Sequence, residues 1–397
     1  MHSIKGVFYI GHGPSSSHTI GPHNAVRYIL NKYPNAEFIK VKLCGSLAST
    51  GKGHLTDYII DKYLGNIKHH IIFDARKRVK HPNTMLFEIT LPNNEIKKET
   101  IVSIGGGVIT VNGEKKQDGI DLYPHHTLSE IMAYCRDYGY SLWEYVLFHE
   151  GEEILSYIDE IYQAIKKSVQ NGINADGELP GELHVKRKAK LMYENMIKEH
   201  KEDDIQTNVA IASFAASEEN AAGGVIVVAP TCGSAGVIPG VVKYLEMKKV
   251  PYEDIRKGFL VAGLIGLLAK TNASISGAEA GCQAEIGVAC SMGAAMVSTA
   301  LGYDYKRIAQ SAEVALEHSL GLTCDPVKGY VQIPCIERNV LAATRAETAV
   351  RLAEYAADTR SISFDTIVQT MIETGRDLKK EYRETSEGGL ATKIKVQ

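Results

Sequence analysis

Strand-forming patterns are confined to the first third of this 397-residue chain, and this segregation most constrains its fold. Three short β-rich runs alternate there with helical patterns, at residues 38–43, 85–91 and 99–104. From about residue 127 the β signal fades, and apolar residues recur at helical spacing over 127–145 and 152–171. We therefore predict an α+β protein, with a small α+β domain at 1–125 followed by a mostly α-helical domain at 126–397.

The predicted helical domain contains segments rich in glycine and alanine, at residues 221–224 and 293–297. Small side chains let helices approach closely, so we expect these helices to pack around a central site. The most apolar stretch, residues 259–269, is shorter than the roughly 20 residues that span a bilayer and is typical of a buried core helix. The N-terminal residues lack the charged region and apolar core of a signal peptide, which favours a cytoplasmic protein.

Acidic and basic residues are nearly balanced, 47 against 44, and give a formal net charge of −3. Because they are spread along the chain, they form no basic stripe that could neutralise a phosphate backbone. The triglycine at 105–107 lacks the surrounding residues of a phosphate-binding loop. We therefore expect neither nucleic acid nor a membrane as a partner, and no nucleotide site.

The chain has seven cysteines, at positions 44, 135, 232, 282, 290, 324 and 335. In a cytoplasmic protein they are reduced, so each is either a buried thiol or a ligand. Cys324 and Cys335 stand beside prolines and turn residues, where side chains can converge on one metal. Three well-separated thiolates could hold an iron–sulfur cluster with one iron open to substrate. Free cysteine is also among the most buried residue types, and Cys290 could share a helix face with Cys282, so spacing alone does not choose the ligands.

Residues 11–22 combine three serine hydroxyls, two imidazoles and turn residues ahead of an amphipathic helix. Backbone N–H groups at a helix start, aided by hydroxyls, suit an anion such as a substrate carboxylate. His18 would then lie beside that anion, where an imidazole with an ordinary pKa of about 6.5 can exchange a proton. The alternative interpretation is a plain Ser/Thr helix cap.

Residues 271–292 are dense in small and polar side chains, where a core helix would carry Leu and Ile. This composition indicates a role other than packing. Glu279 and Glu285 lie six residues apart in it, and we expect them to cap a helix or support a ligand rather than to form a paired acid and base.

Motifs along nearly the whole chain resemble those of the iron–sulfur-dependent L-serine dehydratases, also called L-serine ammonia-lyases. They lie, in order, at residues 13–19 (GPSSSHT), 45–48 (GSLA), 50–54 (TGKGH), 103–107 (SIGGG), 218–224 (EENAAGG), 274–279 (SISGAE) and 322–326 (LTCDP). The resemblance implies a lyase that converts L-serine to pyruvate and ammonia, with a small domain related to a substrate-binding regulatory domain ahead of a helical catalytic domain.

The resemblance also implies a [4Fe-4S] cluster bound by Cys282, Cys324 and Cys335, with Cys290 in a supporting place. It makes His18 the base that removes the Cα proton of the substrate. The cluster would act as a Lewis acid and not as a redox centre. We expect hydroxyls from both domains to orient the substrate, namely those of Ser15, Ser16, Ser17, Thr19, Ser274 and Ser276.

The sequence departs from the family pattern at two places. Some members end in a cysteine thought to occupy the open iron, whereas this sequence ends at Gln397, so we expect no capping by that route. Many members have Asn where this chain has Cys232, in the segment Pro-Thr-Cys-Gly. Substrate contacts there are expected to differ, and Cys232 could approach the cluster.

Two other functions stay open: a related lyase acting on threonine, cysteine or a hydroxy acid, and a noncatalytic cluster-bearing sensor or regulatory subunit. The combination of His18 with three ligand cysteines favours the enzyme. We recognise no motif for the Schiff-base lysine of a pyridoxal phosphate enzyme. Lys52 and the basic run at 186–188 are either solvated or part of a substrate pocket. The Ala- and Gly-rich helices favour a homodimer.

Overall fold

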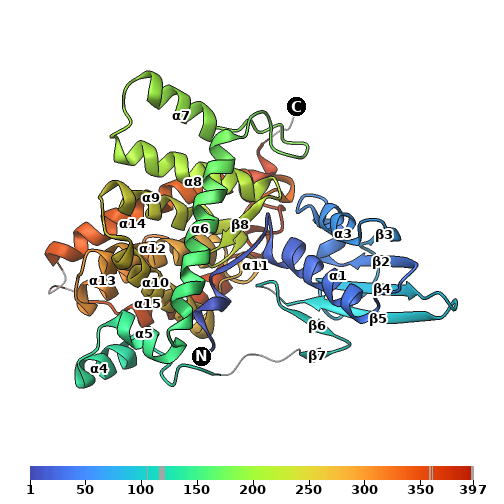
Figure 1. The fold of residues 1–397 in the computed structure, drawn as a ribbon, viewed down its shortest axis with the longest axis horizontal. Coiled ribbons are helices and arrows are strands. Elements are labelled where there is room, and N and C mark those ends of the chain that lie inside the picture. Colours follow the sequence, from blue (N-terminus) through green and yellow to red (C-terminus); the bar gives the residue numbers. More distant parts are fainter. Residues whose placement is uncertain (105, 116–120, 357–358, 360, 395–397) are drawn as a thin grey trace.

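A sheet domain and a larger helical body lie side by side in the computed structural model of this chain (Figure 1). The structure describes residues 1–104, 106–115, 121–356, 359 and 361–394. Gly105 of the triglycine motif and the terminal residues 395–397 lie outside this description. The predicted α+β class, with strands first and helices after, is confirmed.

The sheet has the strand order β3-β2-β4-β5-β6-β7. Its strands are β2 (Phe38–Cys44), β3 (Lys68–Asp74), β4 (Thr84–Thr90), β5 (Ile96–Ser103), β6 (Ile109–Val111) and β7 (Glu114–Lys115). β2 and β3 pair in parallel, and the other neighbours pair antiparallel. The three predicted β-rich runs correspond to β2, β4 and β5. Sequence reasoning missed β3, which carries no fully buried residue and therefore lacks a clear apolar face.

Helices cover one face of this sheet. Alternate residues of β2, such as Ile39 and Val41, are buried together with Val26 of α1 (Gly21–Lys32) and Ile59 of α3 (Thr56–Leu64). The short helix α2 (Ser46–Ser49) follows β2 directly. α1 begins after residues 15–20, so the sheet domain fixes one side of the polar loop that the sequence singles out.

The helical body is built around α12, all of whose residues are buried, and α10, which is buried from Gly258 to Ala269. Its helices are α4 (Leu128–Tyr138), α5 (Leu142–Glu150), α6 (Glu153–Asn174), α7 (Ala189–Lys198), α8 (Ile205–Ala221), α9 (Val237–Met247), α10 (Tyr252–Asn272), α11 (Gly277–Ala280), α12 (Val288–Ala300), α13 (Tyr305–Glu317), α14 (Cys335–Ala356) and α15 (Phe364–Asp377). A Cβ added to Gly293 would lie 2.9 Å from Val241, which confirms close packing at small residues. Among the described residues, no helix has the length and apolar character needed to cross a membrane.

The helical pattern predicted over 127–145 is two helices rather than one. α4 ends at Gly139, whose φ of +73° belongs to the left-handed region that glycine adopts readily. α5 begins two residues later with a capping box, in which the Ser141 side chain accepts from the Glu144 N–H and the Glu144 carboxylate accepts from the Ser141 N–H. The apolar periodicity runs through both helices, so it did not reveal the break at Gly139 and Ser141 that these local residues specify.

The first residues of the chain belong to the core of the helical body. β1 (Tyr9–His12) pairs antiparallel with β8 (Val225–Val228), and Phe8 is fully buried with its ring 5.7 Å from that of Phe259. The Met1 amino group donates to the Tyr123 carbonyl at 2.8 Å. Residues 1–12 thus pack in the helical body, although they belong to the predicted first domain, 1–125. The domain boundary at 125–126 stays a proposal.

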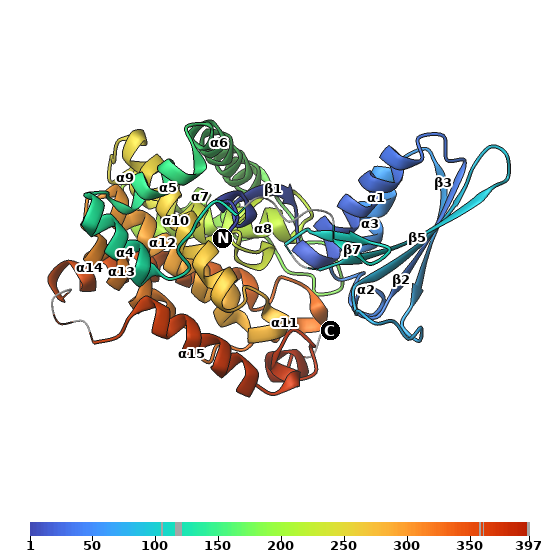
Figure 2. The same ribbon diagram turned by 90° about the horizontal axis from the view of Figure 1, so that it is seen from below.

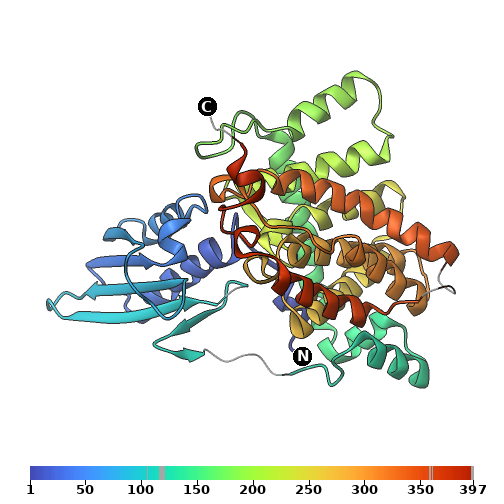
Figure 3. The ribbon, with the colours of Figure 1, turned by 180° about the vertical axis from the view of Figure 1, so that it is seen from behind.

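The C-terminal segment returns to the junction of the two parts, as Figure 2 and Figure 3 show. After α15 it forms two short 3-10 turns, η7 (Lys380–Tyr382) and η8 (Gly389–Thr392). The segment between them pairs with the loop of Cys324: the Cys324 N–H donates to the Tyr382 carbonyl at 2.8 Å, and the Glu384 N–H donates to the Cys324 carbonyl at 2.7 Å.

Candidate functional site

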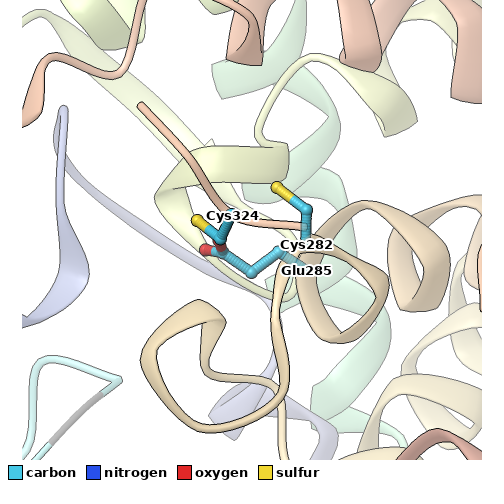
Figure 4. A group of neighbouring side chains, drawn as sticks. All are labelled: Cys282, Glu285 and Cys324. Carbon is cyan, nitrogen blue, oxygen red and sulfur yellow. The ribbon is translucent and has the colours of Figure 1, made fainter. Parts of the chain in front are cut away.

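Two buried thiols and a carboxylate converge inside the helical body. One ligand atom each of Cys282, Glu285 and Cys324 lies within 4.8 Å of the other two, so these residues could hold a metal ion (Figure 4). Cys335 is also buried, and its thiol interacts electrostatically with Cys282 and Glu285. The three cysteines that the sequence singles out therefore lie in one neighbourhood, although they come from separate elements.

A sharp turn brings Cys282 to this neighbourhood. Gly281 has a φ of +74°, and a Cβ there would lie 2.7 Å from the Leu322 carbonyl oxygen, so the turn requires glycine. The fully buried Gln283 side chain then donates to the Ala280 carbonyl and accepts from the Gly321 N–H. These bonds hold the Cys282 turn against the loop that carries Cys324.

Glycines also leave room for the Glu285 carboxylate. A Cβ at Gly277 would lie 2.6 Å from Glu285 Oε2 and 3.1 Å from Cys324 Sγ, and a Cβ at Gly233 would lie 2.8 Å from Glu285 Oε1. Thr231 donates to Oε1 at 2.7 Å, and the Cys324 thiol lies 3.9 Å from Oε2. The prediction that Glu279 and Glu285 act as caps or supports misses this convergence, because they lie in different elements, α11 and the π-turn η4 (Gln283–Gly287).

Protein groups alone stabilise the thiolates of Cys324 and Cys335 poorly. The hydrogen bond with Cys282, together with burial, raises the pKa of Cys324 well above its ordinary value. Burial, with the nearby charge of Cys282, does the same to the pKa of Cys335. A bound cation would reverse this penalty, because coordinating thiols are deprotonated by the metal.

Charged groups around the thiols come from α14 and from the C-terminal segment. Arg338 donates to the Thr323 carbonyl at 2.6 Å and to Asp325 at 3.1 Å, one on each side of Cys324. Burial and the charge of Glu285 raise the pKa of Glu384 to about 8. Sequence reasoning missed Arg338 and Glu384, since the first lies in a helical pattern and the second in a polar tail.

The polar loop folds as a π-turn, η2 (Ser16–Ile20), that leads into α1. The Ser15 hydroxyl caps it by accepting from the His18 N–H at 3.2 Å. Thr19 donates to the His54 carbonyl at 2.7 Å, and Thr56 donates to the His18 carbonyl at 2.6 Å. Ser15 and Thr19 therefore shape the loop, and the Ser/Thr cap in the alternative interpretation is present together with the imidazole.

His18 lies buried in a cage of hydroxyls next to a second imidazole. Ser17 Oγ lies 2.8 Å from its Nδ1, and Ser46 Oγ lies 2.9 Å from its Nε2. The ring of His54 is 4.7 Å away between centroids, and its buried Nε2 has no hydrogen-bond partner within the part of the chain that the structure describes. Burial and the neighbouring His54 lower the pKa of His18 well below 6.5, and burial lowers that of His54 to about 4. Both rings are neutral near pH 7, the form that accepts a proton.

A short segment of the helical body connects this loop to the thiols. Ser16 donates to Cys232 Sγ at 3.4 Å, and the adjacent Thr231 bonds Glu285. Cys232 is within electrostatic range of Glu285, but its thiol pairs with Ser16 and it is not in the group of Cys282, Glu285 and Cys324. The segment 231–232 is thus the direct link between the hydroxyl loop and the candidate metal centre.

The remaining predicted residues lie around this centre or away from it. Ser274 is buried, donates to Glu279 and accepts from the Ser276 N–H at 3.0 Å. The Ser276 hydroxyl stands at the start of α11 without a capping bond. Cys290 points away, with its thiol 3.2 Å from the Ala342 carbonyl, and Lys188 pairs with Glu337 on the surface.

These features are those of an enzyme with a candidate active site at the junction of a sheet domain and a helical body, where thiols that could hold a metal are linked to neutral imidazoles. Comparison with known proteins gives the family. The model described as "Serine dehydratase beta chain" matches residues 3–65, and that described as "Serine dehydratase alpha chain" matches residues 76–391. The chain belongs to the serine dehydratase family.

Relatives match over almost their whole length. The chain is 36% identical to L-serine dehydratase 1 of Escherichia coli (strain K12), with 99% of each chain covered. It is 37% identical to the L-serine dehydratases of Haemophilus influenzae and Streptomyces coelicolor, again with 99% of each chain covered. The family resemblance inferred from motifs is thereby confirmed.

Proposed function

We propose that this chain is a lyase that removes water from L-serine and yields pyruvate and ammonia. The observation that carries the proposal is the convergence of Cys282, Cys324 and Glu285, linked through Thr231 and Cys232 to the loop of His18, whose neutral imidazole lies next to that of His54. The names of the relatives supply the substrate, since several that match over 99% of both chains are L-serine dehydratases.

Cys282, Cys324 and Cys335 would hold a [4Fe-4S] cluster. The fit is supported by three buried cysteines, whose sulfurs are soft donors, and by the glycines that leave space at Glu285. When bound, the cluster would supply a Lewis acid that makes the substrate hydroxyl a better leaving group. Arg338 would offset part of the negative charge of three thiolates.

His18 would remove the Cα proton of the substrate, because it is neutral and held in one orientation by Ser17 and Ser46. The neighbouring His54 is a second candidate for this step, since its Nε2 has a free position for a proton. Loss of water gives an enamine, which tautomerises to an imine and hydrolyses in water. We infer that the hydroxyls of Ser16, Ser17 and Ser276 orient the carboxylate, while Ser15, Thr19 and Ser274 hold the surrounding loops.

A cysteine comparison tests the ligand set. Cys324→Ala should abolish both the visible absorbance of the cluster and turnover of L-serine, because a metal ligand is lost. Cys290→Ala removes an equally buried thiol of the same body and should keep both. Anaerobic reconstitution followed by absorption spectroscopy measures the first property, and pyruvate release measures the second. Equal cluster content in the two variants would contradict the assignment.

Substrate choice is tested with the unmodified protein. Pyruvate or 2-oxobutyrate release should be fastest with L-serine when threonine and cysteine are offered to anaerobically purified protein. A preference for threonine or cysteine would indicate the related lyases, and cluster formation without turnover would indicate a sensor or regulatory subunit. Exposure to air should inactivate the enzyme, since an iron without a fourth cysteine ligand is vulnerable to oxygen. A cytoplasmic location and a homodimer stay predictions from the sequence.

A further inference from the structure

We propose that Glu285 is a fourth protein ligand of the cluster: in the substrate-free enzyme its carboxylate occupies the iron that the three cysteines leave open, and L-serine displaces it. This inference rests on the proposed function and concerns the resting state of the same site. It assigns Glu285 a role that neither the sequence pattern nor the names of the relatives indicates.

The position of the carboxylate supports ligation. A Glu285 oxygen lies within 4.8 Å of the thiol sulfurs of both Cys282 and Cys324 (Figure 4). A carboxylate that reaches two ligand sulfurs this closely can also reach a metal bound between them.

The carboxylate is held in one orientation by groups on both sides. Thr231 donates to Oε1, which leaves Oε2 directed at the Cys324 thiol. Gly277 and Gly233 stand where any side chain would collide with the two oxygens, at 2.6 Å and 2.8 Å. The second oxygen is therefore oriented toward the thiols before any metal binds. Hydrogen-bond partners such as Thr231 commonly orient metal ligands in this way.

Electrostatics favours a cation at this carboxylate. A second carboxylate, that of Glu384, lies close enough to Glu285 for their negative charges to repel each other. Arg338 is the positive group that acts on Glu285, and it also bonds Asp325. Bound iron would stabilise the Glu285 carboxylate, and a hard oxygen ligand on a site that otherwise prefers sulfur is exchangeable for substrate.

The test measures solvent at the cluster rather than activity. Three proteins are reconstituted anaerobically and reduced: wild type, Glu285→Ala and the matched control Glu99→Gln. The control changes a buried glutamate of the sheet domain. Electron–nuclear double resonance is then recorded in water labelled with a magnetic oxygen isotope. We expect no coupling to solvent oxygen in wild type and in Glu99→Gln, and full coupling in Glu285→Ala, where water takes the vacated position.

Coupling of equal strength in wild type and Glu285→Ala would overturn the inference while leaving the proposed function intact. Failure of the wild-type protein to form a four-iron cluster would overturn both. If Glu285→Ala does not retain the cluster, Glu285→Gln, which keeps the shape and can still accept from Thr231, should show the same gain of solvent coupling, and its absence would count against ligation. Addition of L-serine should abolish the difference between wild type and the variant, because substrate replaces either ligand.

Discussion

At the scale of single residues, the imidazole of His18 carries the sharpest prediction about chemistry. His18→Ala should lower turnover of L-serine by about a hundredfold or more, since a general base contributes roughly that much. Cluster absorbance should stay unchanged, because His18 bonds Ser17 and Ser46 and not the cysteines. His23→Ala is the matched control. It removes the imidazole of His23 in α1, which lies against the ring of Tyr63 in α3. Full turnover in His18→Ala would transfer the role of base to another group, with His54 the first to examine.

The second residue-scale prediction concerns pH and stability. Burial lowers the pKa of His54 to about 4, so the unfolded chain binds a proton that the folded one does not between that value and about 6.5. Protonation of His54 in the unfolded chain therefore costs no unfolding free energy above pH about 6.5, and it lowers the unfolding free energy as the pH falls below that value. Between pH 7 and 5, wild type should lose about 2 kcal/mol more unfolding free energy than His54→Asn. Denaturant titrations at both pH values measure this difference, and parallel losses in the two proteins would refute it.

At the scale of elements, the turn before η2 depends on the absence of a side chain at Gly13. A Cβ there would lie 2.2 Å from the Asn220 carbonyl oxygen and 2.3 Å from its side-chain Oδ1. Gly13→Ala should therefore destabilise the protein by about 2 kcal/mol, a typical cost of overpacking, and displace the loop that carries His18. Gly6→Ala meets only the end of the Lys270 side chain, at 3.5 Å, and should have little effect. Unfolding midpoints of the two variants would separate these outcomes, and equal midpoints would contradict the expectation.

The elements also show how far a sequence predicts this fold and site. β2, β4, β5 and helices such as α1 and α6 were predictable because each carries a periodic apolar face. The pairing of β1 with β8 was not, because each strand has four residues and its partner lies far along the chain. For the site, motif contexts singled out the cysteines and His18, but Ser46, His54 and Glu285 act through neighbours from other elements. Their contacts, such as Thr231 with Glu285, follow from tertiary packing and have no local signature.

At the scale of the whole molecule, the N-terminal segment stabilises the helical body and not the sheet domain. Trp143, the single tryptophan, lies in α5 and reports on that body by fluorescence. Phe8→Ala should lower the unfolding free energy seen by Trp143 by about 3 kcal/mol or more, because it removes a fully buried ring. Phe87→Ala deletes an equally buried ring from the sheet core and should affect this signal less. A larger loss of unfolding free energy in Phe87→Ala than in Phe8→Ala would contradict this expectation. It would show that the stability of the helical body depends on the sheet domain.

The placement of β1 has a consequence for how the protein is made. The His12 ring donates from Nδ1 to the Gly223 carbonyl, 211 residues along the chain, so the first strand leaves the ribosome long before its partner exists. At roughly 5–20 residues per second, this delay lasts on the order of ten to forty seconds. The sheet domain can complete its own core during that time, while the apolar N-terminal segment stays uncovered in the nascent chain. We therefore expect this segment to be the main contact of the growing chain with cellular chaperones, and iron insertion to follow release.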